Sequence, residues 1–146
     1  MTRDDLHRSA EARLADHEQR YTPNRRAIVE TLAARANPVT LPELLRLRPD
    51  LTQSSTYRNL TALQDAEVVR RIVGGGEHAH FELDEHLTAH HHHLVCVQCG
   101  SILDVTLDPR LERRLDRTFD DVAVQHGFDL DGHSIELFGR CATCRG

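Results

Sequence analysis

Two cysteine pairs with the spacing CxxC constrain this chain more than any other feature. They are Cys96 with Cys99 and Cys141 with Cys144, and they account for all four cysteines of the 146 residues. Four thiolates in two such pairs match the tetrahedral coordination of structural Zn(II). Because the pairs are far apart in the sequence, one ion held by both would close the whole intervening segment into a unit.

Two redox-active dithiols or two disulfides are the alternatives to a zinc site. The chain shows no secretory signal and no long apolar run, so we expect a cytoplasmic protein without a membrane segment. Thiols stay reduced in that compartment, which favours metal binding over disulfides. The sequence therefore predicts structural Zn(II) at the four cysteines.

A run of four histidines, from His90 to His93, leads directly into the first cysteine pair. The apolar and β-branched residues that follow the run are typical of a strand. Side chains alternate between the two faces of a strand, so His90 and His92 would share one face and His91 and His93 the other. One run can therefore supply two metal sites. The alternative is a tag-like tract on a solvated face, but a tag would stand at a terminus.

The charge is distributed unevenly along the chain, although the total is only −5. Residues 1–73 hold 12 arginines against 10 acidic residues, a net charge of +2, whereas residues 74–146 hold 6 arginines against 13 acidic residues, a net charge of −7. This asymmetry indicates an N-terminal half that can approach phosphates and a C-terminal half suited to cations. The chain has no lysine, so arginine would supply its cationic phosphate contacts.

The N-terminal half reads as helices followed by a hairpin. Helical patterns cover residues 4–20 and 22–35, a capping box begins a third helix at Thr40, and a fourth follows over residues 51–63. Residues 68–73 and 78–83 then read as a β-hairpin, with positive φ expected at the glycines 74–76. This order predicts a winged helix-turn-helix that binds DNA. Its candidate DNA contacts are Ser54, Ser55, Thr56, Tyr57, Arg58, Arg70 and Arg71.

The C-terminal half reads as a small unit of three strands and one helix. Beyond the histidine strand, residues 101–106 and 133–138 read as strands, and a helix runs from Pro109 to a stop at Gly127. Such a unit has an incomplete core and an exposed sheet edge, which a second copy would cover. We therefore expect an α+β fold with a winged-helix DNA-binding domain over 1–84 and a small α/β metal-binding dimerisation domain over 85–146.

Three segments resemble the ferric uptake regulator family, and the resemblance extends over nearly the whole chain from Tyr21 onward. The segments are 56–60 (TYRNL), 90–100 (HHHHLVCVQCG) and 133–144 (HSIELFGRCATC). The resemblance implies a homodimeric repressor that binds inverted-repeat operators in double-stranded DNA when loaded with metal. The implied role is the control of metal uptake, with zinc or iron as the metal.

The resemblance also implies roles for individual residues. It assigns the structural zinc to Cys96, Cys99, Cys141 and Cys144. It assigns the regulatory metal to Glu82, His91, His93 and Asp104, and a second metal site to His90, His92, Glu112 and His133. For DNA, Tyr57 and Arg58 match the recognition helix, and Arg20 and Arg25 match basic positions ahead of and within the preceding helix.

One family ligand is missing from this chain. Many members have a histidine where this sequence has Asn37 or Pro38. We infer that His78 or His80 replaces it, because His80 and Glu82 are two apart on a strand and share a face. His80 is thus included in the predicted regulatory site.

The sequence does not select the regulatory ion. Imidazole and carboxylate ligands suit Zn(II), Fe(II), Mn(II) and Ni(II) alike. A peroxide-sensing repressor of the same family is one alternative function. A hydrolase that uses the second cluster is another, although three histidines and a carboxylate fill a tetrahedral site. A zinc buffer without DNA binding would have no use for the winged helix.

Overall fold

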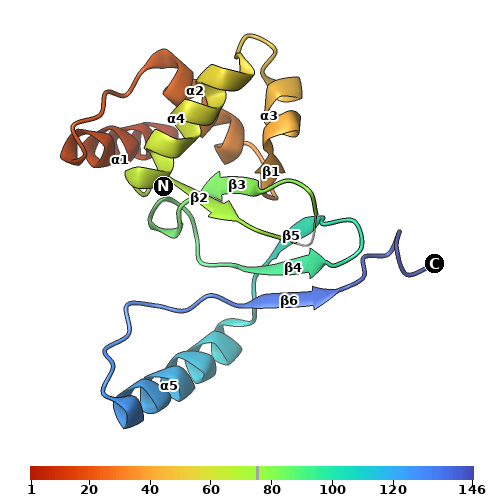
Figure 1. Ribbon diagram of the computed structural model, residues 1–146. Coiled ribbons are helices and arrows are strands. Elements are labelled where there is room, and N and C mark those ends of the chain that lie inside the picture. The colour runs from red at the N-terminus through yellow and green to blue at the C-terminus, as the bar shows by residue number, and fades with distance from the viewer. Residues whose placement is uncertain (75) are drawn as a thin grey trace.

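The computed structural model describes residues 1–74 and 76–146 and contains two small sheets with helices around them (Figure 1). Four helices belong to the N-terminal part: α1 (Arg3–Asp16), α2 (Pro23–Ala33), α3 (Leu41–Leu47) and α4 (Gln53–Asp65). The strands β1 (Val39–Thr40), β2 (Val69–Ile72) and β3 (His80–Leu83) complete it. The short 3-10 helix η1 (Glu85–Leu87) leads to β4 (His92–Cys96), β5 (Ile102–Val105), α5 (Pro109–His126) and β6 (Glu136–Gly139).

The starts of the N-terminal helices follow from local sequence. The Thr22 side chain accepts a hydrogen bond from the N–H of Arg25, with proline at the next position. Thr40 and Glu43 form the predicted capping box at α3. The apolar faces of these helices share one core, which contains Ile28, Val29, Leu44, Leu60 and Leu63 among its fully or almost fully buried side chains.

The first sheet has the order β1-β3-β2, with both pairs antiparallel, and completes a winged helix. Gly74 does not have the positive φ expected in the glycine turn, and Gly75 lies outside the described residues. Gly74 and Gly76 allow close packing. A Cβ on Gly76 would stand 3.2 Å from the Cα of Gly100, and one on Gly74 would stand 3.3 Å from the Ile102 side chain.

The second sheet has the order β5-β4-β6, in which β4 pairs antiparallel with β5 and parallel with β6. A small apolar cluster of Ile72, Val95 and Ile102 joins it to the first sheet. The wing, which consists of the paired strands β2 and β3, therefore packs directly on the second sheet, which leads into the first cysteine pair. The predicted division at residues 84 and 85 falls between β3 and η1.

Helix α5 projects from the second sheet (Figure 1) and ends at Gly127, whose φ of 73° is left-handed. Apolar side chains of this helix are not covered within one chain, since Leu111 is 40% exposed and Val122 50% exposed. Strand β6 is also uncovered, with Phe138 63% exposed. These apolar surfaces are where a second copy of the chain would pack. No described helix is both long and apolar enough to cross a membrane.

Candidate metal centres and DNA-binding surface

The four cysteines come together where β4 and β6 end. Parallel pairing of these strands, extended by a hydrogen bond from the N–H of Val97 to the carbonyl of Gly139, brings the second pair beside the first. All four thiols are free, and their sulfur atoms lie within 4.8 Å of one another. Gly100, with a φ of 74°, supplies the left-handed turn after the first pair.

The local electrostatics favour a dication at the cysteines. Hydrogen bonds from backbone N–H groups, that of Cys99 foremost, lower the pKa of Cys96 to about 6. The neighbouring thiols, that of Cys141 foremost, raise the pKa of Cys144 to about 12. Four thiolates cannot form so close together without a positive charge between them. This soft, tetrahedral set of donors therefore fits Zn(II).

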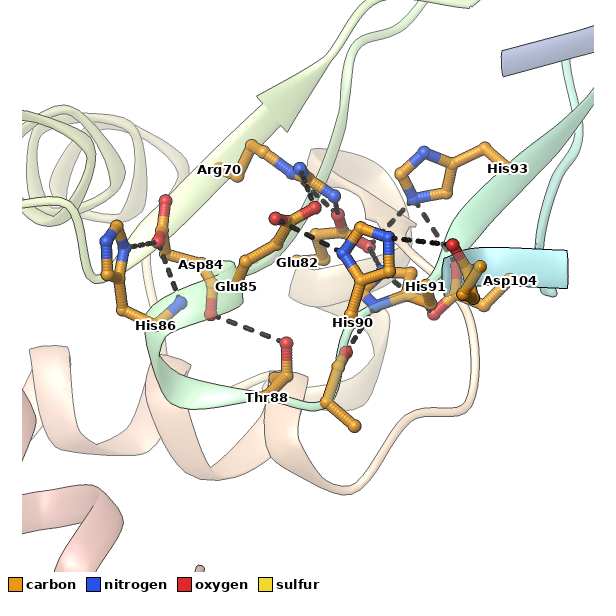
Figure 2. A network of polar contacts seen from close by, with 12 residues as sticks. Arg70, Glu82, Asp84, Glu85, His86, Thr88, His90, His91, His93 and Asp104 are labelled. Atoms are coloured by element: carbon orange, nitrogen blue, oxygen red, sulfur yellow. Dashed lines mark hydrogen bonds and ion pairs between the residues drawn. The ribbon is translucent and has the colours of Figure 1, made fainter. Parts of the chain in front are cut away.

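A second group of ligands lies between the two sheets and consists of Glu82, His91, His93 and Asp104 (Figure 2). One oxygen of Glu82, Oε2, lies 3.2 Å from Nε2 of His91 and 3.3 Å from Nε2 of His93. Each Nε2 atom also lies 3.7 Å from an oxygen of Asp104. Nδ1 of His91 bonds the carbonyl of Ala89, which fixes the tautomer that leaves Nε2 free to bind a metal.

Charges in this group are arranged for a cation. Burial would raise the pKa of Glu82, but hydrogen bonds from His93 and Arg70 outweigh burial and lower that pKa to about 2. Burial, together with the charge of Glu82, raises the pKa of Asp104. Burial would lower the pKa of His91, yet its hydrogen bonds to Ala89 and Glu82 raise that pKa. A bound cation would offset the repulsion between the carboxylates of Glu82 and Asp104. It would also displace the proton that His91 otherwise holds.

A third group lies on the opposite side of the histidine run and consists of His90, His92, Glu112 and His133. The carboxylate of Glu112, on α5, lies 2.9 Å from Nε2 of His92, 3.6 Å from Nε2 of His133 and 3.8 Å from Nε2 of His90. Nδ1 of His133 is 3.3 Å from Asp116, a carboxylate that can orient the ring. Asp116 was not predicted from the sequence, although it is one helical turn from Glu112.

Buried polar atoms in both histidine groups support metal binding. Oδ1 of Asp104, Oε2 of Glu112 and Nε2 of His133 are buried, and none has a hydrogen-bond partner among the described residues. Leaving such atoms unsatisfied is costly, and a bound cation would satisfy the carboxylate oxygens and the imidazole nitrogen alike. The residues present therefore fit a divalent ion in each group.

His80 does not belong to the group around Glu82. The imidazole is buried, which lowers its pKa, and its charged neighbour is Glu43 at the start of α3. The first-sheet register explains this, because His80 pairs with Thr40, the N-cap of that helix. The geometry thus gives no support to His80 as a replacement ligand. Asn37, one of the two positions at which the family resemblance implies a histidine, accepts a hydrogen bond from the N–H of Asp104 at 3.1 Å.

The predicted DNA contacts fall into accessible and inaccessible residues. Ser54, Tyr57 and Arg58 are exposed on α4, where they line a hollow together with Gln53, a residue that sequence reasoning missed. Ser55 is half-buried, and its hydroxyl oxygen accepts hydrogen bonds from the side-chain amides of Asn24 and Asn59. Arg20 and Arg71 are exposed.

Three predicted DNA contacts are engaged inside the protein. Thr56 is 1% exposed, and its hydroxyl donates to the carbonyl of Thr52. Arg25 donates to Asn59, to the carbonyl of Arg20 and to Gln19. Its guanidinium thus joins α2 to α4 and to the segment before α2. Arg70 donates to Glu82 and Glu85 instead of pointing to solvent. In this arrangement the polar groups of these three side chains are held by hydrogen bonds within the chain.

Comparison with known proteins gives relatives for nearly the whole chain. Residues 16–138 match the ferric uptake regulator family. The ferric uptake regulation protein of Campylobacter jejuni is 33% identical over 131 residues, 86% of this chain and 79% of that protein. The peroxide-responsive repressor PerR of Staphylococcus aureus is 30% identical over 132 residues, 86% of this chain and 82% of that protein. The solved Fur of Helicobacter pylori shares the fold, with a TM-score of 0.76 at 20% identity over 100% of this chain and 95% of that one.

A winged helix joined to a small dimerisation unit, with three groups of candidate metal ligands, defines a metal-binding transcription regulator rather than an enzyme. The chain belongs to the ferric uptake regulator family. The expected family and fold class are confirmed, and the hydrolase alternative is not supported.

Proposed function

We propose that this protein represses transcription when a divalent ion binds the group of Glu82, His91, His93 and Asp104. One observation carries the proposal: Glu82 comes from β3 of the wing, whereas His93 and Asp104 come from β4 and β5 of the second sheet and His91 from the residue just before β4. The complete ligand set exists only when the two parts of the chain are close together. Ion binding would therefore favour this closed arrangement over any open one.

Closure would set the distance between the two recognition helices of a dimer. The uncovered apolar surfaces of α5 and β6 supply a dimer interface, and a two-fold dimer matches an operator with inverted-repeat symmetry. The exposed residues of α4, Tyr57 and Arg58 among them, would read base edges in the major groove. Arg20 and Arg71 would contact phosphates, which makes binding salt-dependent.

The three groups would then have different roles. The four cysteines hold structural Zn(II), and the group around Glu112 binds a further divalent ion. The two carboxylates and two imidazoles of the group around Glu82 suit Fe(II) and Zn(II), and also Mn(II) and Ni(II). Relatives named for iron uptake and for the peroxide response support control of metal homeostasis. We place the domain division between residues 84 and 85 and the protein in the cytoplasm.

DNA binding to the protein's own promoter region tests the proposal. The dimer, with its cysteine site kept loaded, is titrated anaerobically with Zn(II), Fe(II), Mn(II) or Ni(II) at buffered free concentrations. We expect one ion to tighten DNA binding at least tenfold in the wild type, but not in His91→Ala or His93→Ala. His17→Ala, a change at an exposed histidine outside all three groups, is the matched control. DNA binding that is unchanged by every ion would refute metal-dependent repression.

Peroxide sensing is the second candidate function. It is favoured by the 30% identity to PerR of Staphylococcus aureus over 86% of this chain. The test is to expose the Fe(II)-loaded and Zn(II)-loaded proteins to equal peroxide, then measure DNA binding and the mass of the peptide around His91. Oxygen addition and loss of DNA binding in the Fe(II) form alone would support this candidate. Unchanged binding in both forms would exclude it.

A further inference from the structure

Arg70 lies between two carboxylates at the centre of the network in Figure 2. It stands directly opposite Glu82 in the pairing of β2 with β3. Its Nε donates to Oε1 of Glu82 at 2.9 Å, a terminal nitrogen donates to the same oxygen, and the other terminal nitrogen donates to Oε1 of Glu85 at 2.8 Å. The side chain is only 25% exposed, so these contacts are partly shielded from water.

The contact with Arg70 decides how Glu82 faces the metal ligands. Oε1 is occupied by the guanidinium, whereas Oε2 lies beside His91 and His93. Glu82 can therefore offer one oxygen to an ion. A guanidinium can also donate to both oxygens of a carboxylate in a bidentate contact. In that geometry Oε2 of Glu82 would move away from His91 and His93.

Glu85 continues the network towards the third group. Its second oxygen, Oε2, lies 3.7 Å from Nδ1 of His90, and Nε2 of His90 lies 3.8 Å from Oε2 of Glu112. Charged and polar side chains thus form a continuous path from the carboxylate of Glu82, through Arg70, Glu85 and His90, to that of Glu112. At 39% exposed, His90 is the most accessible side chain of the histidine run.

We propose that Arg70 and Glu85 couple the two histidine groups, so that an ion in the group around Glu112 tightens ion binding in the group around Glu82. When Nε2 of His90 serves as a ligand, its Nδ1–H faces Glu85 and holds that carboxylate on Arg70. When Nε2 of His90 binds no ion, the Glu85 carboxylate is no longer held against Arg70. The guanidinium of Arg70 then forms a bidentate contact with both oxygens of Glu82. Arg70 and Glu85 are therefore positioning residues rather than ligands.

The coupling rests on the proposed function, because it presumes that the group around Glu82 binds an ion. Coupling between two sites is reciprocal and commonly changes affinity by 5-fold to 150-fold. We expect a factor of about five or more, since the path has only two intermediary side chains besides the ligands. Each ion should tighten the binding of the other by the same factor.

The test compares Zn(II) affinities with and without an intact third group. The protein with its cysteine site loaded is titrated with Zn(II) against a competing chelator, and His93→Ala identifies the binding step that belongs to the group around Glu112. We expect the group around Glu82 to bind Zn(II) at least fivefold more tightly in the wild type than in His133→Ala. In Arg70→Gln and in Glu85→Ala, His133→Ala should change this affinity by a factor of about one.

Arg13→Gln is the matched control, because Arg13 also pairs with a glutamate, Glu67, but lies on α1 outside all three groups. It should keep the fivefold ratio. A uniform loss of affinity with the ratio preserved in Arg70→Gln and Glu85→Ala would overturn the coupling, because that result describes a purely structural role. If Arg70→Gln does not fold, Glu85→Ala decides alone.

Two further outcomes are distinguishable. Equal affinities in the wild type and His133→Ala would overturn the coupling but leave the proposed function standing. Absence of any Zn(II) bound by the group around Glu82 in the wild type would overturn both.

Discussion

The side chain of Asn37 accepts a hydrogen bond from the backbone N–H of Asp104, at 3.1 Å. This bond joins the segment between α2 and β1 to β5, and so links the winged helix to the second sheet beside the candidate metal ligands. Asn37 also lines a cavity of about 570 Å³ together with Glu82, His91 and Asp104. Asn37 thus faces the same group of candidate ligands, but its side chain is held by the backbone of β5.

Replacing Asn37 by histidine should convert this position into a ligand. The imidazole would reach the cavity that the group around Glu82 shares, and a further nitrogen donor should tighten Zn(II) binding about tenfold or more, or roughly 1.4 kcal/mol. Titration against a chelator measures the affinity. Asn37→Ala, which removes the hydrogen bond without adding a donor, should lower stability by about 1 kcal/mol and leave the affinity no tighter. Equal affinities in the two variants would contradict the prediction.

The affinity of the group around Glu82 for its ion should depend on pH through His91. Imidazole binds metal only when neutral, and the pKa of His91 is raised above the ordinary value of 6.5. The affinity should therefore fall as the pH drops through this raised value, and it should be restored on returning to higher pH. Chelator competition at fixed ionic strength between pH 8 and 5.5 checks this. An affinity that stays constant over the range would show that His91 is not a ligand.

Loss of the structural ion should destabilise the second sheet. The cysteine pairs join the ends of β4 and β6, and apparent binding free energies of structural Zn(II) are about 10–16 kcal/mol. Cys96→Ser should lose about one Zn(II) per chain by atomic absorption and lower the melting temperature by more than about 10 °C. Ser101→Ala, which removes only the hydroxyl beside Cys99, is the milder control. Full zinc content in Cys96→Ser would contradict the assignment.

A methyl group on Gly76 should loosen the wing from the second sheet. The added Cβ would stand 3.2 Å from the Cα of Gly100, and because both atoms are held by backbone, relief requires the wing to move. We expect a loss of about 1–3 kcal/mol in the free energy of unfolding, measured with urea. Gly132→Ala, where an added Cβ meets nothing within 4 Å, should change stability far less. Similar losses in both variants would refute close packing as the cause.

Local sequence determined the elements and the type of ligand in each group. Thr40 with Glu43 marks the start of α3, and Gly127 marks the end of α5, because capping depends on residues that are neighbours in the chain. The separation of His91 and His93 from His90 and His92 follows from the alternation of side chains along an extended segment. The CxxC spacing likewise predicted that the cysteines would gather.

Only the tertiary structure decided which distant residues meet. Glu82 and His80 lie on the same strand, yet pairing with β1 places His80 near Glu43, while Arg70 on β2 holds Glu82 beside the histidines. Gly76 meets Gly100 because the wing packs on the second sheet. These contacts depend on how two sheets pack, and side-chain directions at such a junction are set by non-local packing that no local pattern encodes.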